Sequence, residues 1–333
     1  MAVLVTGAAG YIGSHTCLAL LERGHDVVAV DNLCNSDKVS LEKVAAMTGV
    51  PLKFFESDVR DLDRLTKIIA ENQIDTVFHL AGLKSVPDSV LRPLEYYDNN
   101  VGGALAILRG AAQLGVKRIL FSSSASLYGN QPNQPVRETT PLLPAESPYG
   151  RTKAIVEEML TDVAHATPGM SVVHLRYFNP AGAHPSGAIG ESPREKPEGL
   201  MSSIVEVAAG RRDFLTVYGG DYPTPDGSAQ RDYLHICDLA EGHVAALSAL
   251  DEPGVHVFNL GAGRPVSVLE LIAAFKAVTG IDLPCQIGLR RAGDLPASWA
   301  DVSKAREQLG WRAIRSLEEI CTDAWAFERA HRG

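Results

Sequence analysis

The first half of the chain alternates short apolar runs with longer segments of helical periodicity. Nearly every position in the apolar runs is hydrophobic, which is typical of strands buried on both faces of a parallel sheet. The runs are Ala2–Thr6, Asp26–Asp31, Leu52–Glu56, Thr76–Leu80, Lys117–Ser122 and Ser171–Tyr177. The helical segments between them are Tyr11–Arg23, Leu62–Glu71, Leu94–Leu114 and Ser147–Ala166. Strands and helices in alternation predict an α/β fold with a doubly wound parallel sheet, the Rossmann arrangement.

The pattern changes after Tyr177. Residues 180–199 contain four prolines and four glycines, which indicates an irregular loop, and shorter elements follow it. We expect helices near Leu200–Ala209, Val268–Val278 and Ser303–Leu309, and strands near Leu215–Tyr218 and Gly254–Leu260. Two domains are predicted: the Rossmann domain over residues 1–179, and a smaller α/β domain over residues 180–333 whose chain crosses back near residues 232–260.

Composition narrows the classes of partner. The chain has 333 residues, of which 45% are hydrophobic and 21% charged, and its net charge of −9 argues against nucleic acid, because phosphate binding needs a basic surface. No apolar run is long enough to cross a membrane, and the first residues lack the basic start of a signal peptide. The five cysteines are scattered without a C-x-x-C pair, so we expect no disulfides, no metal site and a cytoplasmic location.

Three glycines follow the first predicted strand. Gly7, Gly10 and Gly13 form G-x-x-G-x-x-G and lead directly into a helix, which is a variant of the dinucleotide-binding fingerprint. Glycines let a pyrophosphate approach the backbone, and the helix N-terminus offers unpaired N–H groups to the anion. A tight strand–helix turn without any ligand is the alternative interpretation of the three glycines taken alone.

Two aspartates end the next two strands. Asp31 closes the second strand, where a carboxylate accepts hydrogen bonds from the ribose hydroxyls of NAD and repels the 2′-phosphate of NADP. We therefore expect NAD as the cofactor; a turn-forming aspartate before Asn32 is the alternative. Asp58, after the third strand, is placed either to reach the adenine or to cap the following helix.

A serine, a tyrosine and a lysine supply candidate chemistry. Ser124 lies at the end of the fifth strand, and Tyr149 and Lys153 are four residues apart, so that they share one helix face. The lysine ammonium and the positive nicotinamide ring favour the phenolate and lower the pKa of Tyr149. Tyr149 then takes the proton of an alcohol that Ser124 holds, while the alcohol carbon gives hydride to NAD. A Tyr-x-x-x-Lys pair by itself is also common on solvated helix faces.

Together these motifs resemble the extended short-chain dehydrogenase/reductase family, and within it the group that epimerises UDP-glucose and UDP-galactose at C4. The most specific stretches are Val3–Gly13, Asp31–Ser36, His79–Lys84, Phe121–Gly129 and Ser147–Lys153. The resemblance implies that Ser124, Tyr149 and Lys153 are catalytic. It implies NAD contacts from Gly7, Gly10, Tyr11, Ile12, Gly13, Asp31, Asn32, Leu33, Cys34, Asn35, Ser36, Asp58, Val59, Leu80, Ala81, Gly82, Lys84, Asn99, Ser122, Tyr149, Lys153, Tyr177 and Phe178.

The groups that an elimination would need are missing beside the catalytic serine. In related dehydratases an acidic pair follows a threonine at this place, whereas here the chain continues with Ala125 and Ser126. Neither side chain can shuttle the protons that loss of water requires, so a 4-keto sugar has to wait for the hydride to return. If the ketose rotates first, the hydride enters the opposite face and C4 is inverted, so we expect reversible 4-epimerisation of UDP-hexoses.

If the sugar is to rotate within the site, the UDP part of the substrate has to be bound firmly. The resemblance places the UDP-binding site, beside Ser124 and Tyr149, at Asn179, Leu200, Thr216, Tyr218, Arg231, Tyr233, Arg291 and Asp294, with Gly199 and Ser298 at two further positions of the site. Arg231 and Arg291 can neutralise the pyrophosphate, and Tyr218 can pack against uracil or ribose. A solvated surface charge is the alternative for an arginine taken alone.

Two of these positions depart from the family pattern. Ser298 stands where members restricted to unacetylated sugars carry a bulky tyrosine, so we expect room for the N-acetyl group of UDP-GlcNAc and UDP-GalNAc as well. Gly199 stands where many relatives carry asparagine, which either weakens binding or opens further space.

Other functions stay open on the sequence alone. The rivals are a decarboxylase or dehydratase of nucleotide sugars and a non-catalytic NAD-binding regulator, while a simple alcohol dehydrogenase would need free exchange of NAD and NADH. The resemblance also implies a homodimer packed through helices, which we expect at Leu94–Leu114 and Ser147–Ala166.

Overall fold

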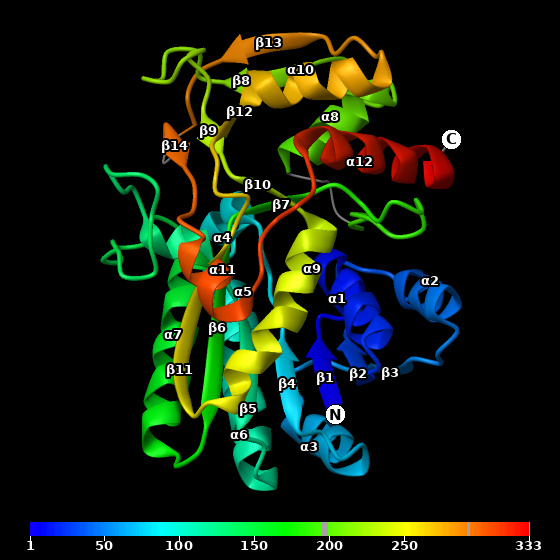
Figure 1. Ribbon diagram of the computed structural model, residues 1–333, viewed down its shortest axis with the longest axis vertical. Helices are drawn as coiled ribbons and strands as arrows, with labels where there is room; N and C mark the ends of the chain where they lie inside the picture. The colour runs from blue at the N-terminus through cyan, green and yellow to red at the C-terminus, as the bar shows by residue number, and fades with distance from the viewer. Residues whose placement is uncertain (195–198, 292–293, 333) are drawn as a thin grey trace.

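Seven parallel strands form the central sheet of the computed structural model, which describes residues 1–194, 199–291 and 294–332 (Figure 1). The strands lie in the order β11-β6-β5-β4-β1-β2-β3, so that β1 and β4 are neighbours near the centre. They are β1 (Ala2–Thr6), β2 (Asp26–Asp31), β3 (Lys53–Glu56), β4 (Thr76–His79), β5 (Arg118–Ser124), β6 (Ser171–Tyr177) and β11 (Gly254–Leu260). The doubly wound α/β fold predicted from the apolar runs is confirmed.

Helices cover both faces of this sheet. One face carries α1 (Tyr11–Glu22), α2 (Val39–Thr48) and α9 (Ile236–Ala245). The other face carries α3 (Leu62–Glu71), α6 (Gly103–Leu114) and α7 (Pro148–Ala166). A separate apolar core lies under each layer of helices, and the strands contribute side chains to both cores. Burial from both sides explains why these strands are apolar throughout instead of alternating.

The helix predicted over Leu94–Leu114 is present, but it contains a π-helical turn that was not predicted. A short α5 (Pro93–Tyr96) is followed by a π-helical turn, Tyr97–Gly102, and α6 begins only at Gly103. The turn places Asn100 so that its side-chain amide bonds to the backbone of Leu83, and this buried contact offsets the loss of regular helix. The preceding α4 (Val86–Leu91) was not predicted. In addition, β5 runs to Ser124 instead of ending at Ser122, because Ser123 and Ser124 pair with β6.

The second half of the chain forms a smaller layer above the carboxyl ends of the central strands, at the top of Figure 1. Its strand pairs are β8 (Leu215–Tyr218) with β13 (Cys285–Gly288) and β7 (Asn179–Ala181) with β10 (Tyr233–His235), and β9 (Gln230–Arg231) lies between β12 (Val266–Ser267) and β14 (Ala297–Ser298). Its helices are α8 (Leu200–Ala208), α10 (Val268–Thr279), α11 (Ser303–Leu309) and α12 (Leu317–Arg332). The segment with α9 and β11 returns to the large sheet, where β11 extends the edge beside β6.

Two further observations concern membrane-spanning helices and the state of the cysteines. Within the described ranges, no helix is both long enough and apolar enough to cross a membrane. All five cysteines are free thiols, and Cys17, Cys237 and Cys321 are buried.

Candidate active site

The glycine loop lies between β1 and α1 and touches the loop after β4. Gly7 has a φ of 69°, and a Cβ on it would lie 2.7 Å from the backbone nitrogen of Ala81. A Cβ on Gly13 would lie 2.1 Å from the carbonyl oxygen of Gly7. Only glycine fits at either place. Gly10 precedes α1 without a side-chain cap, so the first turn of the helix faces outward through backbone N–H groups, which suits the pyrophosphate of a dinucleotide.

Asp31 ends β2 beside this loop and is buried. Its carboxylate accepts hydrogen bonds from the Ala9 backbone nitrogen at 3.0 Å, the Leu33 backbone nitrogen at 2.8 Å and the Ser36 hydroxyl at 2.9 Å. The hydrogen bond from the Leu33 nitrogen forms a turn of the kind expected if Asp31 is a turn-forming aspartate, which was the alternative interpretation. The bond to Ala9 also ties the carboxylate to the glycine loop, so it is held where the ribose hydroxyls of NAD would lie.

Asp58 does not cap the helix that follows it. Asp61 is the N-cap of α3 and accepts from the Arg64 backbone nitrogen at 3.0 Å, so the capping interpretation of Asp58 is wrong. Asp58 instead binds the guanidinium of Arg60 and the amide of Asn32. The Arg60 hydrogen bonds hold the pKa of the Asp58 carboxyl well below its usual range, so this group stays charged at neutral pH.

The loop after β4 is held by a residue that the sequence analysis missed. Oδ1 of Asn100 accepts from the Leu83 backbone nitrogen at 2.8 Å, while Nδ2 donates to the Leu83 carbonyl and to the hydroxyl of Thr152, each at 3.0 Å. Asn100 therefore joins the predicted NAD-binding stretch Leu80, Ala81, Gly82 and Lys84 to α7. The neighbouring Asn99, predicted to contact NAD, is half-buried. Two consecutive asparagines inside a predicted helix, where asparagine is unfavourable, were the available signal.

Ser124, Tyr149 and Lys153 come together where β5 meets α7. Nζ of Lys153 donates to the carbonyl oxygen of Ser122 at 2.6 Å and lies 4.8 Å from the ring centroid of Phe121 and 6.0 Å from that of Tyr149. Ser124 hydrogen-bonds to Tyr149 through its side chain. The solvated-face interpretation of the Tyr-x-x-x-Lys pair is wrong, since Lys153 is only 6% exposed. Burial lowers the pKa of Lys153 to about 8.

The electrostatic environment of Tyr149 differs from the expectation. Burial raises the pKa of Tyr149, and the hydrogen bond with Ser124 and the charge of Lys84 act in the opposite direction without overcoming burial. The expected net lowering of the Tyr149 pKa is therefore not found in the protein alone, because burial outweighs the opposing effects. Lys84, whose charge acts to lower the pKa of Tyr149, also pairs with Glu191 at 2.8 Å.

Several other predicted cofactor residues border the same region. The Tyr11 hydroxyl donates to the Gly182 carbonyl at 2.6 Å and so bridges α1 to the second half of the chain. The hydroxyl groups of Tyr177 and Ser122 are in contact, and Phe178 packs with Tyr128 in a small apolar cluster. Ile12, Asn32, Leu33 and Asn35 are half-buried, Val59 and Ser36 are buried, and Cys34 is exposed.

Four predicted substrate residues form a continuous chain in the smaller layer. The guanidinium of Arg291 lies 4.2 Å over the ring of Tyr218 and 3.6 Å from Asp294. The other oxygen of Asp294 accepts from Arg231 at 2.7 Å, and Arg231 also donates to the Leu295 carbonyl at 2.8 Å. Ser298 on β14 pairs in register with Arg231 on β9. The solvated-charge alternative for Arg231 is wrong, because this side chain is held on three sides.

The remaining substrate residues lie on neighbouring elements. Asn179 and Tyr233 are partners in the β7–β10 ladder, Thr216 lies on β8, and Leu200 is the first residue of α8. Gly199 is the N-cap of α8, and a Cβ there would lie 3.3 Å from the Ser202 hydroxyl, so little space is opened by glycine. Sequence analysis missed Asp232, whose buried carboxylate accepts from the backbone of Ala262, Gly263 and Ala300 and so fixes the loops around Arg231.

Known proteins resemble this chain over almost its whole length. Residues 3–261 match the sequence profile described as Epimerase, the NAD dependent epimerase/dehydratase family. The UDP-glucose 4-epimerase of Yersinia pestis is 51% identical over 329 residues, which are 98% of this chain and 97% of the relative. The crystal structure of UDP-glucose 4-epimerase from Bifidobacterium longum, in complex with NAD+ and UDP, is 45% identical with a TM-score of 0.96 and covers 99% of both chains. The UDP-Glc/GlcNAc 4-epimerase of Campylobacter jejuni is 38% identical with a TM-score of 0.86 and also covers 99% of both.

Proposed function

The chain belongs to the NAD dependent epimerase/dehydratase family, and on that premise we propose that it interconverts UDP-glucose and UDP-galactose by inverting C4 with a bound NAD. The observation that carries this function is the convergence of Ser124, Tyr149 and Lys153 beside the glycine loop. The named activity of the similar proteins from Yersinia pestis and Bifidobacterium longum supports the same reaction.

The residues of this chain divide the work at C4. Ser124 holds the C4 hydroxyl, and Tyr149, as the phenolate, removes its proton while the C4–H bond breaks and the oxygen becomes a carbonyl. NAD held by the glycine loop and Asp31 would supply a reversible acceptor for the hydride of C4. Lys153, held by the Ser122 carbonyl, supplies a positive charge near Tyr149 that favours the phenolate. Tyr149 returns the proton in the second half of the cycle, so that only the configuration at C4 changes.

The UDP-binding residues and the catalytic residues belong to different parts of the fold. We assign the binding of UDP to Arg231, Arg291 and Tyr218 in the smaller layer, while Ser124 lies at the carboxyl end of β5 and Tyr149 in the first turn of α7. A 4-keto sugar that is held only through its diphosphate can rotate between the UDP-binding residues and the catalytic residues. The next turn, Ala125–Tyr128, contains no acid, and the hydroxyl oxygen of Ser126 is buried, so dehydration is not favoured.

We extend the proposed substrates to UDP-GlcNAc and UDP-GalNAc because of Ser298. This residue is half-buried on β14, next to the strand that carries Arg231, so its size affects the wall around the sugar. The relative from Campylobacter jejuni is named for both Glc and GlcNAc substrates, which supports a pocket of this breadth within the family.

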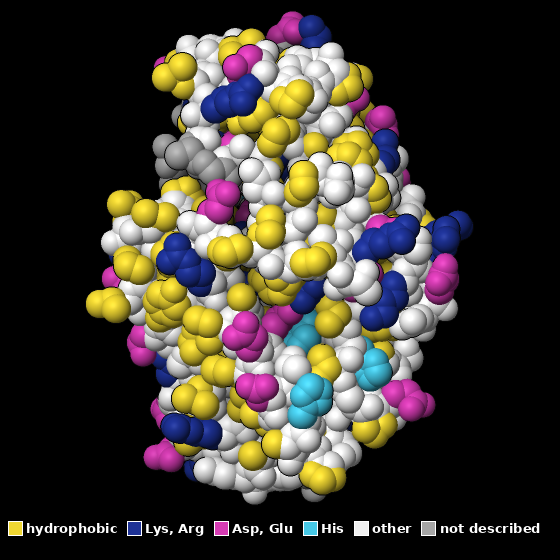
Figure 2. All heavy atoms as spheres, turned by 90° about the vertical axis from the view of Figure 1, so that its left-hand side faces the viewer, with side chains coloured by type: hydrophobic (Ala, Val, Ile, Leu, Met, Phe, Trp, Pro, Cys, Tyr) yellow, Lys and Arg dark blue, Asp and Glu magenta, His cyan; other side chains and the backbone are white. Residues whose placement is uncertain are grey.

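We further propose a homodimer in the cytoplasm. Apolar side chains are exposed on α4 and α5, with Leu91 at 80% and Leu94 at 82%, and both helices pack beside α7. Figure 2, viewed from the left-hand side of Figure 1, shows hydrophobic side chains spread over that face, interspersed with charged ones of both signs. Covering such side chains with a second copy is favourable, and free thiols suit a reducing compartment. The mass of the particle in solution, expected at twice the chain mass of 35.7 kDa, tests the dimer.

A product assay with four UDP-hexoses tests the reaction. Purified protein is incubated separately with UDP-glucose, UDP-galactose, UDP-GlcNAc and UDP-GalNAc, and the sugars are separated after hydrolysis. We expect each sugar to reach equilibrium with its C4 epimer without added NAD, since the cofactor stays bound. A uronate-derived or dehydrated product, or turnover that needs stoichiometric NAD, would falsify the proposal.

A further inference from the structure

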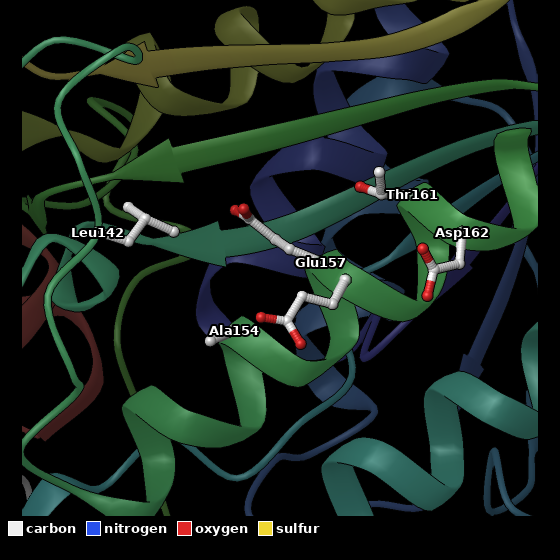
Figure 3. A pocket seen from close by; sticks show the side chains of 6 residues that line it. Leu142, Ala154, Glu157, Thr161 and Asp162 are labelled. Carbon is white, nitrogen blue, oxygen red and sulfur yellow. The ribbon is translucent and has the colours of Figure 1, made fainter.

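Glu157 continues the catalytic face of α7. Tyr149, Lys153 and Glu157 follow one another at four-residue spacing, so their side chains lie along one side of the helix. Figure 3 shows the carboxyl group of Glu157 directed from α7 toward the strands, beside a hollow of about 360 Å³ that the helix borders. No step of the chemistry proposed above uses this carboxylate.

The carboxylate is bound on both oxygens inside the protein. Oε1 accepts from the Ser123 hydroxyl at 2.5 Å and from Nε of Arg176 at 3.0 Å, and Oε2 accepts from Nη2 of Arg176 at 2.6 Å. The side chains of Arg176 and Glu157 are 7% and 8% exposed. Removing two charges from water costs about as much as their attraction returns, so stability alone does not account for a buried pair.

Several parts of the active site meet at this pair. Ser123 lies between Ser122, whose carbonyl binds Lys153, and the catalytic Ser124. Arg176 lies on β6, and its guanidinium stacks 5.2 Å over the ring of Tyr128, in the turn that follows Ser124. The pair therefore connects α7 to the end of β5 and to the turn beyond it.

Resting on the reaction proposed above, we propose that Glu157 is a positioning residue: it provides the counter-charge that keeps Lys153 an ammonium, and it fixes the strand end that carries Ser122 and Ser124. The carboxylate acts on the lysine along the helix and on the serines through the Ser123 hydroxyl. Arg176 in turn holds the carboxylate in its orientation.

The charges around Glu157 give the direction of the effect. Lys153 faces it from α7, Arg176 and His174 face it from β6, and Tyr128 lies beyond Arg176. Burial lowers the pKa of Lys153 to about 8, and the charge of Glu157 opposes that shift. Burial keeps His174 neutral by lowering its pKa to about 4, so His174 adds no charge at neutral pH. Loss of the carboxylate therefore lowers the pKa of Lys153 further, and the ammonium disappears at a lower pH.

The test compares the pH dependence of kcat in Glu157→Gln and in wild-type enzyme. We expect the alkaline limb to move down by about one pH unit, so that kcat on that limb falls roughly tenfold, while KM changes little. Glu158→Gln is the matched control, since Glu158 is the next residue on α7 and borders the hollow without bonding to Ser123 or Arg176. Glu157→Asp should restore part of the wild-type profile.

A double variant separates the electrostatic effect from misfolding. Glu157→Gln leaves Arg176 buried without its partner, so Glu157→Gln/Arg176→Met removes both charges and should fold even where the single variant fails. The alkaline limb should move less in the double variant than in Glu157→Gln, because loss of the Arg176 cation raises the pKa of Lys153 again. An alkaline limb that stays at the wild-type position in folded Glu157→Gln, or that moves further in the double variant than in the single one, overturns the proposal. Wild-type activity is measured in the same series, so a failure of the reaction itself is recognised independently.

Discussion

The two sides of the active site hold their charged groups in different ways. Where α7 packs on the end of β5, Lys153 is buried and held by the carbonyl of Ser122. This is a main-chain atom that binding of a ligand does not displace. In the smaller layer, the side chains of Arg231 and Arg291 are 19% and 57% exposed, and both pair with Asp294.

This difference follows from what each side has to do. Hydride transfer needs groups held at fixed positions, and strands and helices packed in a common core provide them. The UDP side has to admit a large anion, so its arginines lie on short strands and loops and are paired with a carboxylate that a diphosphate can replace. We expect substitutions among the catalytic residues of β5 and α7 to change kcat, and substitutions in the smaller layer to change KM.

Tyr149→Phe should have the largest effect. The variant keeps the ring in its half-buried position and loses only the hydroxyl that moves the proton, so we expect kcat to fall about 10³-fold with UDP-galactose while KM stays within a few-fold. Steady-state kinetics with NAD content measured alongside checks this. A kcat within tenfold of wild type would remove Tyr149 from the proton transfer and undo the distinction between the two sides.

Arg231→Met should change mainly KM. Loss of a charged hydrogen bond to the diphosphate costs about 2 kcal/mol, which is roughly a 30-fold rise in KM. We expect kcat to change little, because the residue is remote from the proton transfer. Arg231→Lys serves as the control that keeps the charge, and its KM should lie between that of the wild type and that of Arg231→Met. A fall in kcat at constant KM would show that the smaller layer also positions the reacting carbon.

Ser298→Tyr should have the smallest effect on the parent sugars. A bulky ring beside the sugar leaves UDP-galactose turnover within a few-fold of wild type, whereas kcat/KM for UDP-GalNAc should fall about 10–200-fold. The ratio of the two kcat/KM values is the measurement, and Ser298→Ala, which keeps the space, should leave that ratio unchanged. Equal losses for both sugars would mean that Ser298 does not border the C2 substituent.

The local pattern of hydrophobic and polar residues predicted most of the helices and strands. The predicted bounds of β1, β2, β6, β8 and β11 agree with the structure, because a run of buried apolar residues marks a strand whatever its partners are. Between Leu94 and Leu114 the pattern predicted the helix but not the π-helical turn within it, where the side chain of Asn100 hydrogen-bonds to the backbone of Leu83. Helical periodicity does not encode such a contact between distant segments.

The sequence by itself determined which chemical groups are present and their local spacing. Three glycines before a helix and a tyrosine four residues before a lysine indicated a dinucleotide and a proton transfer, since both motifs are defined within one turn or one helix face. Only the tertiary structure decided which charges meet. Asp294 pairs with Arg231, and Glu157 pairs with Arg176, because the register of neighbouring strands and the packing of α7 bring them together. Those long-range pairings decide which cations are held rigidly and which are available to a ligand.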